Sequence, residues 1–263
     1  KLQIIETHNN DIVWYYNLLK NSNNLLSKLV SYKSILYTKR FLSNNNKRFI
    51  YIALNDHDKS GYLDYIAESN LWLIPGGVKI PEKDTFLRSS KKNEIRLIFV
   101  GSLNVKMNYD ALHYFSSVFY MHIINSIKSK VIVNIVGRSP TDKIKRLCDK
   151  YNWILSSDVS DSELSTLLYN SDFMILPFPY TTGTKMKLLE AFSHNLPILA
   201  TKIINNQIDL TKYKDYNFGV FSDSADKWIE CINSCFKTNN LKDIAEEYSC
   251  ENVNKVLFQN IIK

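Results

Sequence analysis

The chain has 263 residues, of which 45% are hydrophobic and 22% are charged, a composition typical of a globular protein with a sizeable core. Its seven glycines and six prolines are too few for a collagen-like, linker-like or proline-rich disordered chain. The 33 basic residues outnumber the 26 acidic ones and are mostly lysines. Because arginine is the side chain best suited to reading bases, we expect a phosphorylated ligand or an anionic membrane surface as partner, or none, and no nucleic acid.

The four cysteines, Cys148, Cys231, Cys235 and Cys250, form no Cys-x-x-Cys motif and are too few for a disulfide framework. This usage is typical of a reducing compartment, so we expect a cytoplasmic protein. No apolar run approaches the ~18 residues of a membrane span, and no signal-peptide pattern opens the chain. Because the chain begins at Lys1 rather than at a methionine, close to strand-like sequence, we expect it to be part of a longer protein.

Residues 1–75 form the first region of the predicted organisation. Strands are expected over 2–6 and 48–54, and a helix is expected to begin near Asp58. Between the strands, residues 12–41 carry leucines, aromatic residues and lysines at helical spacing. This basic amphipathic stretch suits peripheral contact with the inner face of an anionic membrane, and the alternative interpretation is an ordinary solvated helix surface.

Residues 76–90 are predicted to link two domains, because two prolines and two glycines fall within 71–81 and a polar run follows. Over residues 91–248, short apolar runs alternate with helical patterns. Strands are expected over 95–101, 131–137, 153–156, 173–178 and 197–201, and helices over 108–127, 141–151, 161–170 and 184–194. The alternation predicts an α/β domain with a doubly wound parallel sheet, in which ligands bind at the carboxyl ends of the strands, where Gly101 and Gly137 fall.

The polar turn TTGT, over residues 181–184, lies at another of these ends and leads directly into a helix. Free amides and the positive dipole end make a helix start favourable for an anion. Lys185 and Lys187 stand in the first turn, where cations are favourable only if an anion is bound. Glu190 follows three residues later and could accept hydrogen bonds from a ribose diol, whereas a solvated lysine–glutamate pair is the alternative interpretation.

Residues 178–201, FPYTTGTKMKLLEAFSHNLPILAT, resemble the GTGxKxKLLEAxAxGxPVVAT segment of family 4, or group 1, glycosyltransferases of the GT-B fold. Three more segments resemble this family's donor domain, in the same order: FVGSLNVKMNYDAL (99–112), VNIVGRSP (133–140) and SSDVSDSELSTLLYNSDFMILPF (156–178). LIPGGV (73–78) is similar to the interdomain IPNGV, and YSCENV (248–253) to the SWENV before the last crossover helix. The likeness extends over nearly all of residues 48–263.

The resemblance implies a GT-B-like fold with two Rossmann-like lobes, of which the N-terminal one, on the acceptor side, is only partly present as residues 1–75. It implies a nucleotide-sugar-binding domain over 91–248, for a donor such as a UDP- or GDP-sugar, and a helix over 249–263 that packs back on the first lobe. It further implies a hexosyltransferase-type enzyme that retains the anomeric configuration and needs neither cofactor nor metal. The acceptor would be a glycan or a lipid-linked glycan in cell-surface polysaccharide or glycoconjugate synthesis.

The resemblance also implies roles for individual residues. Glu190 would hold the ribose hydroxyls and Lys187 the diphosphate, while the backbone near Asp158 would face the base. The donor-binding set implied in this way consists of Gly101, Ser102, Gly137, Arg138, Asp158, Val159, Thr182, Gly183, Thr184, Lys185, Lys187 and Glu190. His8, in THNND (7–11) after the first strand, resembles the family's HN motif and would contact the transferred sugar, although a lone histidine there is also common in structural roles. The candidate catalytic residues are therefore His8, Lys187 and Glu190.

Two positions depart from the family pattern. Many members carry a glutamate where Thr182 stands and an arginine where Ser102 stands, so the charge of the phosphates must be met by Lys185 and Lys187. The missing glutamate leaves open a second reading, a non-catalytic GT-B-like subunit that binds glycans or stabilises a partner transferase. Absence of nucleotide-sugar turnover in the full-length protein would favour this second reading.

Asp56, His57 and Asp58 spell the DxD pattern of the other large glycosyltransferase fold, GT-A, in which two carboxylates share a divalent cation. We favour a helix cap formed by Asp56 or Asp58, because the segment aligns with the SExD helix start of the GT-B family. The remaining histidines show no metal-ligand spacing, so no metal site is predicted.

Overall fold

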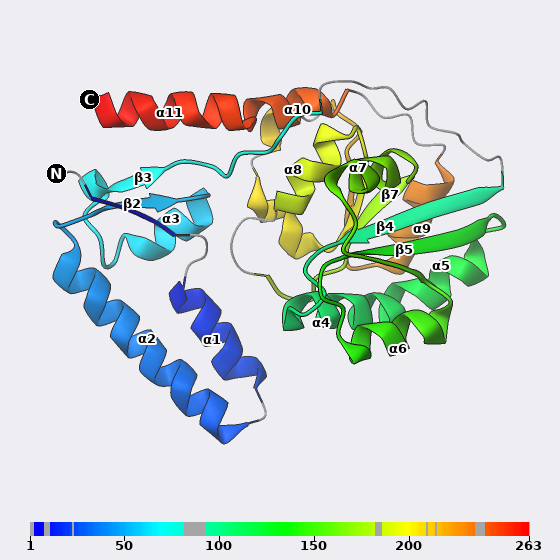
Figure 1. Ribbon diagram of the computed structural model, residues 1–263, viewed down its shortest axis with the longest axis horizontal. Helices are drawn as coiled ribbons and strands as arrows, with labels where there is room; N and C mark the ends of the chain where they lie inside the picture. The colour runs from blue at the N-terminus through cyan, green and yellow to red at the C-terminus, as the bar shows by residue number, and fades with distance from the viewer. Residues whose placement is uncertain are drawn as a thin grey trace. The chain divides into compact units, whose positions relative to one another are not determined.

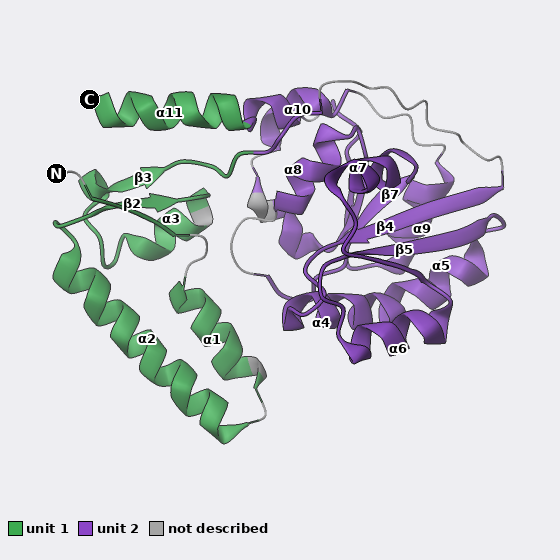
Figure 2. Cartoon of the chain, in the orientation of Figure 1, with its two compact units in different colours: residues 1–77, 182–184, 250–263 green, residues 78–181, 185–249 purple. Residues whose placement is uncertain are grey.

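The computed structural model describes residues 3–7, 11–22, 24–81, 93–181, 186–208, 210–213, 215–234 and 240–262. The described chain forms two compact units (Figure 2). The first unit contains the residues up to Gly77 and the C-terminal helix α11 (Cys250–Ile262), and the second contains the described residues from Val78 to Ser249. The helices that the structure describes include none long and apolar enough to cross a membrane.

The first unit is built on a small parallel sheet with the strand order β1-β2-β3 (Figure 1). Its elements are β1 (Ile4–Glu6), α1 (Asp11–Asn21), α2 (Leu25–Asn45), β2 (Ile50–Ala53), α3 (Asp56–Tyr62), a short 3-10 helix (Glu68–Asn70), β3 (Leu71–Leu73) and α11. The stretch of helical spacing over 12–41 is helical as expected, and it divides into the two helices α1 and α2. The Asn24 side chain accepts hydrogen bonds from the Leu26 and Ser27 amides, which begins a new helix at Leu25.

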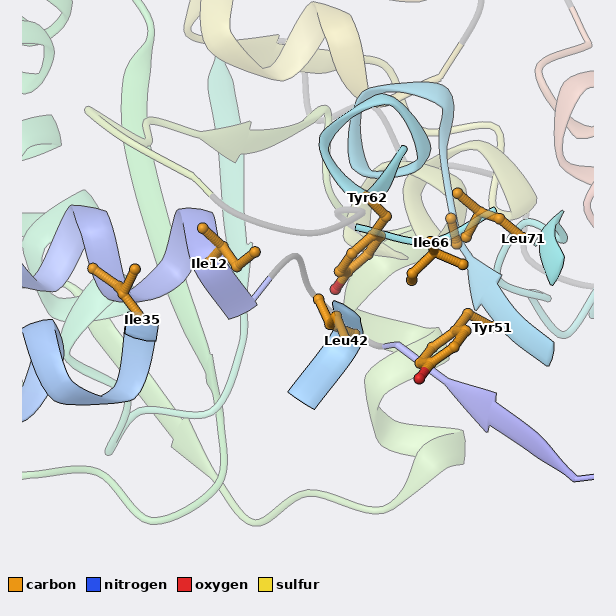
Figure 3. Packing of buried hydrophobic residues seen from close by; sticks show 8 residues of the cluster. Ile12, Ile35, Leu42, Tyr51, Tyr62, Ile66 and Leu71 are labelled. Atoms are coloured by element: carbon orange, nitrogen blue, oxygen red, sulfur yellow. The ribbon is translucent and has the colours of Figure 1, made fainter. Parts of the chain in front are cut away.

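A compact hydrophobic core holds the first unit together. Ile12 of α1 and Ile35 of α2 lie between the two helices, and Leu42, near the end of α2, packs with Tyr51, Tyr62, Ile66 and Leu71 of the sheet region (Figure 3). All of these side chains are buried. Burying each large apolar side chain contributes on the order of 1.5–3 kcal/mol, so this core fixes α1 and α2 to the sheet.

The second unit has a six-stranded parallel sheet with the order β6-β5-β4-β7-β8-β9. The strands are β4 (Glu94–Val100), β5 (Lys130–Gly137), β6 (Ile154–Ser157), β7 (Phe173–Leu176), β8 (Ile198–Ala200) and β9 (Gly219–Phe221). The helices are α4 (Lys106–Tyr114), a π-helix (Phe115–Tyr120), α5 (Met121–Ser126), α6 (Asp142–Tyr151), α7 (Asp161–Tyr169), α8 (Met186–Ser193), α9 (Ala225–Asn233) and α10 (Lys242–Glu247), with 3-10 turns at Lys202–Gln207 and Thr211–Tyr213. Right-handed crossovers place α4 and α6 on one face of the sheet and α7 and α8 on the other (Figure 1).

Local capping explains where the helices nearest the carboxyl edge begin. Thr141 accepts a hydrogen bond from the Ile144 amide at the start of α6. Ser160 and Glu163 form a reciprocal capping box at the start of α7. Both helices therefore begin within a few residues of the strands that precede them, which keeps the intervening loops short.

Two features of the second unit differ from the sequence prediction. The helix expected over 108–127 contains the π-helix at its centre, where Phe119 stacks on Trp228 of α9 with ring centroids 4.0 Å apart. The sheet has a sixth strand, β9, that was not predicted. Gly219 opens β9 with a φ of +117°, and a Cβ atom there would lie 1.9 Å from the Ile198 carbonyl oxygen, so this glycine is required for pairing with β8.

Candidate functional site

The strand order of the second unit creates a switch point between β4 and β7. From β4 the chain proceeds to β5 and β6 on one side, and from β7 it proceeds to β8 and β9 on the other. In a sheet of this order, the helices and loops diverge at the carboxyl ends of the two central strands and leave a crevice for a ligand. The candidate residues of the second unit come from the ends of β4, β5 and β6 and from α8.

Gly101 and Gly137, which follow β4 and end β5, are packed backbone to backbone. The Gly101 carbonyl oxygen lies 1.7 Å from the point that a Cβ atom on residue 137 would occupy, so residue 137 must lack one. The Gly101 amide donates to the Val136 carbonyl at 3.0 Å, and the Leu103 amide donates to the Arg138 carbonyl at 2.8 Å. These bonds continue the β4–β5 pairing beyond both strands and hold the two chain turns together.

Lys187 of α8 lies directly against Gly101. A Cβ atom on residue 101 would be 2.9 Å from Lys187 Cε and 2.9 Å from Asn108 Nδ2. The Lys187 ammonium is also 5.7 Å from the centre of the Phe178 ring, which is buried after β7. The absence of a side chain at residue 101 therefore makes room for a lysine that comes from the far side of the switch point.

Asn108 has a positioning role that the sequence analysis did not single out. Its side chain is buried and donates a hydrogen bond to the Ser102 carbonyl at 2.8 Å, which holds the turn after β4. Ser102 itself is exposed. Its signal in the sequence was its place in the segment FVGSLNVKMNYDAL (99–112), close to the glycine turn, but a polar residue at a helix start is ordinarily assigned to solvent.

Lys187 and Glu190 are half-buried on the same side of α8, and neither side chain makes a hydrogen bond or ion pair with another residue that the structure describes. Burial lowers the pKa of Lys187, and the nearby Glu190 carboxylate only partly opposes this. Burial likewise raises the pKa of Glu190, and the nearby charge of Lys187 only partly opposes this. The negative charge of Asp161 adds a smaller increase to the Glu190 pKa. Each charge is therefore incompletely compensated, and an anion beside Lys187 would favour its charged form.

The ends of β5 and β6 are joined through Asp158. Its amide donates to the Gly137 carbonyl at 3.1 Å, and its carboxylate accepts a hydrogen bond from the Ser139 amide at 3.4 Å. Ser139 and Asp158 have φ angles of 53° and 56°, in the left-handed region that is uncommon for residues other than glycine. Arg138 is exposed and Val159 half-buried beside them. Backbone in such conformations is concentrated at ligand-binding sites.

The chain after β7 carries two further polar groups at this edge. The Thr181 hydroxyl is buried and has no hydrogen-bond partner among the residues described. Tyr180, beside it, donates a hydrogen bond to Asp110 of α4, and Asp110 also pairs with Lys106 at 2.5 Å. Buried hydroxyls are nearly always hydrogen-bonded, so the Thr181 hydroxyl is suited to a ligand. The polar turn over 181–184 was the signal for this residue in the sequence, but the implied donor-binding set included Thr182 and not Thr181.

Several predicted positions lie outside the described residues. They are His8, Thr182, Gly183, Thr184 and Lys185. The structure thus brings together Gly101, Gly137 and Lys187 directly and leaves the predicted turn 182–185 and the histidine as predictions.

The predicted cap at residues 56–58 is wrong in detail. Asn55 caps α3: its side-chain oxygen accepts a hydrogen bond from the Asp58 amide at 2.7 Å. The Asn55 amide group in turn donates to the buried Asp58 carboxylate at 2.8 Å. Among the residues that the structure describes, no group of three histidine, cysteine or acidic side chains could hold a metal ion.

Most of the second unit is similar to a known protein family. Residues 94–237 match the family model described as "Glycosyl transferases group 1". A 44.6 kDa protein in the cps region of Klebsiella pneumoniae, itself uncharacterized, is 21% identical over 212 residues, which cover 77% of this chain and 52% of that protein. The chain therefore spans about half the length of this relative.

Solved structures share the fold over most of this chain. Staphylococcus aureus TarM, in complex with α-GlcNAc-glycerol and UDP, superposes with a TM-score of 0.64 at 15% identity over 98% of this chain and 50% of that one. Anabaena HepE, in complex with UDP and glucose, has a TM-score of 0.63 at 14% identity over 86% of this chain and 66% of its own. WaaG, a glycosyltransferase of lipopolysaccharide biosynthesis, has a TM-score of 0.60 at 17% identity over 97% of this chain and 71% of its own. These likenesses confirm the predicted α/β, GT-B-like fold.

Proposed function

The chain belongs to the group 1 glycosyltransferases, and from this premise we propose that its second unit binds a nucleotide-sugar donor at the switch point between β4 and β7. The observation that carries the proposal is the packing of Lys187 against Gly101, which sets the end of a half-buried lysine, without an ion pair among the described residues, beside a bare backbone turn. An anion of the size of a diphosphate can approach the backbone closely only where side chains are absent. Glu190, three residues along α8, supplies the acceptor that a ribose diol requires.

Each part of the donor has residues of matching chemistry. Lys187 and Lys185, with the amides around Thr182, Gly183 and Thr184, would hold the diphosphate, and the turn at Gly101 and Ser102 would approach it from β4. Glu190 would bind the ribose hydroxyls, and the backbone at Asp158 and Val159 would face the base. The buried Thr181 hydroxyl is a further donor or acceptor for this ligand.

The proposed reaction moves a sugar from the donor to an acceptor hydroxyl. The bond from the anomeric carbon to the diphosphate oxygen breaks, a bond to the acceptor oxygen forms, and the acceptor loses a proton. As the diphosphate leaves it gains negative charge, which Lys187 and the backbone amides would stabilise electrostatically without a metal ion. Retention of the anomeric configuration and contact of His8 with the transferred sugar are part of this proposal.

The relatives suggest a setting for the reaction. One is a protein of a cps region, one is an enzyme of lipopolysaccharide biosynthesis, and two solved structures contain UDP. We therefore propose a cytoplasmic enzyme of cell-surface polysaccharide or glycoconjugate synthesis, with a UDP-sugar as the first donor to test, a GDP-sugar as the second, and a glycan or lipid-linked acceptor. The KxKLLEA pattern over 185–191 supports membership of the branch of the family that carries the GTGxKxKLLEA segment.

Calorimetric titration with UDP, GDP, ADP and CMP tests the donor site. Lys187→Ala and Glu190→Ala are each expected to weaken binding of the preferred nucleotide by about tenfold or more, since each removes a charged contact worth on the order of 1.5–3 kcal/mol. Lys227 and Glu230 of α9 are a matched control, because they have the same spacing and are exposed. Unchanged affinity in both α8 variants would overturn the site assignment.

Transfer assays separate the enzyme from the non-catalytic alternative. Nucleotide binding together with release of UDP or GDP from the cognate sugar nucleotide supports the transferase. Binding without turnover in the full-length protein would instead favour the glycan-binding or partner-stabilising subunit, for which Thr182, at the place of the usual glutamate, is the specific observation.

A further inference from the structure

The net positive charge of this protein comes from one segment of the first unit, in which basic residues are not balanced by acidic ones. Residues 12–55 contain seven of the 33 basic residues and none of the 26 acidic ones, so the remainder of the chain balances at 26 of each. The whole formal excess of +7 therefore lies within residues 12–55, and four of these seven basic residues belong to α2. Such a segment is attracted to an anionic surface at long range.

Helix α2 has two apolar sides but only one of them is covered. Ser31, Ile35 and Leu42 are buried, and the last two belong to the core of the first unit (Figure 3). These positions recur at helical spacing, so they define a single inward side. Among the described residues, the core has no member on the opposite side of α2.

The opposite side, which we call the outer face of α2, is the row Leu25, Leu29, Lys33, Leu36 and Arg40. Steps of four, four, three and four residues bring these side chains into one line along the helix. The three leucines are 73%, 51% and 50% exposed, and Leu26 and Tyr37 flank them at 69% and 72%. Lys33 and Arg40 are exposed and take part in no ion pair among the residues that the structure describes. Exposed leucines alternating with unpaired cations are unusual for a surface that faces water alone.

We propose that the outer face of α2 rests on the surface of an anionic lipid bilayer. The leucines would enter the boundary between headgroups and acyl chains, while Lys33 and Arg40 would extend their aliphatic stems and reach the lipid phosphates. The absence of carboxylates over residues 12–55 removes the repulsion that an acidic surface would otherwise meet. A second copy of the chain is a poorer occupant, because its own outer face would bring cations against cations. Nucleic acid would not cover the leucines.

Co-sedimentation with vesicles of phosphatidylcholine, with and without about a third phosphatidylglycerol, tests the proposal. We expect binding to the phosphatidylglycerol vesicles, weak binding to pure phosphatidylcholine, and release near 1 M salt, where the screening length falls to about 3 Å. Lys33→Glu/Arg40→Glu should reduce partitioning by about tenfold or more, as expected when two cations at a lipid surface are reversed. Leu29→Ser/Leu36→Ser should reduce it by a similar factor, because burial of each leucine is lost.

Matched variants on the second unit provide the controls. Lys128→Glu/Arg146→Glu makes the same charge change at exposed positions, and Met121→Ser/Ile154→Ser removes apolar side chains that are 45% and 50% exposed. Both should bind vesicles like the wild type. Equal loss in the control and α2 variants, equal binding to both kinds of vesicle, or a dimer dissociated by Leu29→Ser/Leu36→Ser would each overturn the proposal. The assay contains no sugar nucleotide, and UDP titration of the same variants should match the wild type, so failure here leaves the donor-site proposal standing.

Discussion

The carbonyl oxygen of Gly101 occupies the space beside Gly137 in which any other residue would place its Cβ atom, at a separation of only 1.7 Å. This contact lets the turns after β4 and β5 lie against each other at the carboxyl edge of the sheet. Gly101 is in turn covered by the side chain of Lys187. Two glycines and one lysine thus connect the packing of the sheet to the proposed diphosphate site.

Gly137→Ala is expected to destabilise the second unit strongly. The added methyl group would meet backbone rather than a movable side chain, so the ends of β4 and β5 must separate. Misfit of this kind in a packed core costs roughly 2–4 kcal/mol of unfolding free energy. Denaturant unfolding measures the loss, and an unfolding free energy within about 0.5 kcal/mol of the wild type would contradict this packing of Gly137 on Gly101.

Gly101→Ala should behave in the opposite way, with little loss of stability and a large loss of ligand affinity. The nearest atoms to the new methyl group are the ends of the Lys187 and Asn108 side chains, which can move. We expect less than about 1 kcal/mol of destabilisation and about a tenfold increase in the dissociation constant for the preferred nucleotide. Melting curves and calorimetry on the same preparation measure both quantities. A variant that melts far below the wild type while binding normally would refute this.

Glu190→Gln is expected to make the free protein more stable and its nucleotide binding weaker. Burial raises the pKa of Glu190 above the ordinary 4.5. The folded protein is therefore most stable below about pH 4.5, where this carboxyl is protonated in both states, and it loses stability as the pH rises through the raised pKa. Because glutamine stays neutral, the variant should melt about 2 °C above the wild type near neutral pH, and this difference should disappear toward about pH 4.

The control for Glu190→Gln is Glu230→Gln, at an exposed position of α9. Its melting temperature should follow that of the wild type within about a degree at each pH, since exposed ion pairs contribute little. If Glu190→Gln melts below the wild type at neutral pH, the Glu190 charge is compensated within the protein. That result would contradict the proposal that this carboxylate is left uncompensated for the ribose hydroxyls.

Tyr180→Phe tests the hydrogen bond between Tyr180 and Asp110, which ties the chain after β7 to α4. Loss of the hydroxyl should cost about 1 kcal/mol of unfolding free energy. In a double-mutant cycle with Asp110→Asn, the two changes should be non-additive by at least about 0.5 kcal/mol, because they act on one bond. Additive effects would show that the two side chains contribute independently of each other.

Much of the second unit was predictable because its signals are local. Five of its strands follow from apolar runs between helical patterns, and Gly101 and Gly137 were expected at strand ends before their contact was known. The strand β9 was missed because three residues, opened by a glycine, are too short a run to show a period. The division of the first helical stretch was missed because it depends on the side chain of Asn24 capping α2, and the same residue could equally have continued a helix.

The sequence by itself determined the α/β class of this protein, the likeness to group 1 glycosyltransferases and the concentration of positive charge in residues 12–55, since each depends only on which residues follow one another. Only the tertiary structure decided that β4 and β7 lie side by side, that Lys187 packs on Gly101 and that the leucines of α2 face away from the core. Strand order and burial result from competition among all apolar surfaces of the chain for a limited interior. That competition is settled by contacts between residues far apart in the sequence, which no local pattern contains.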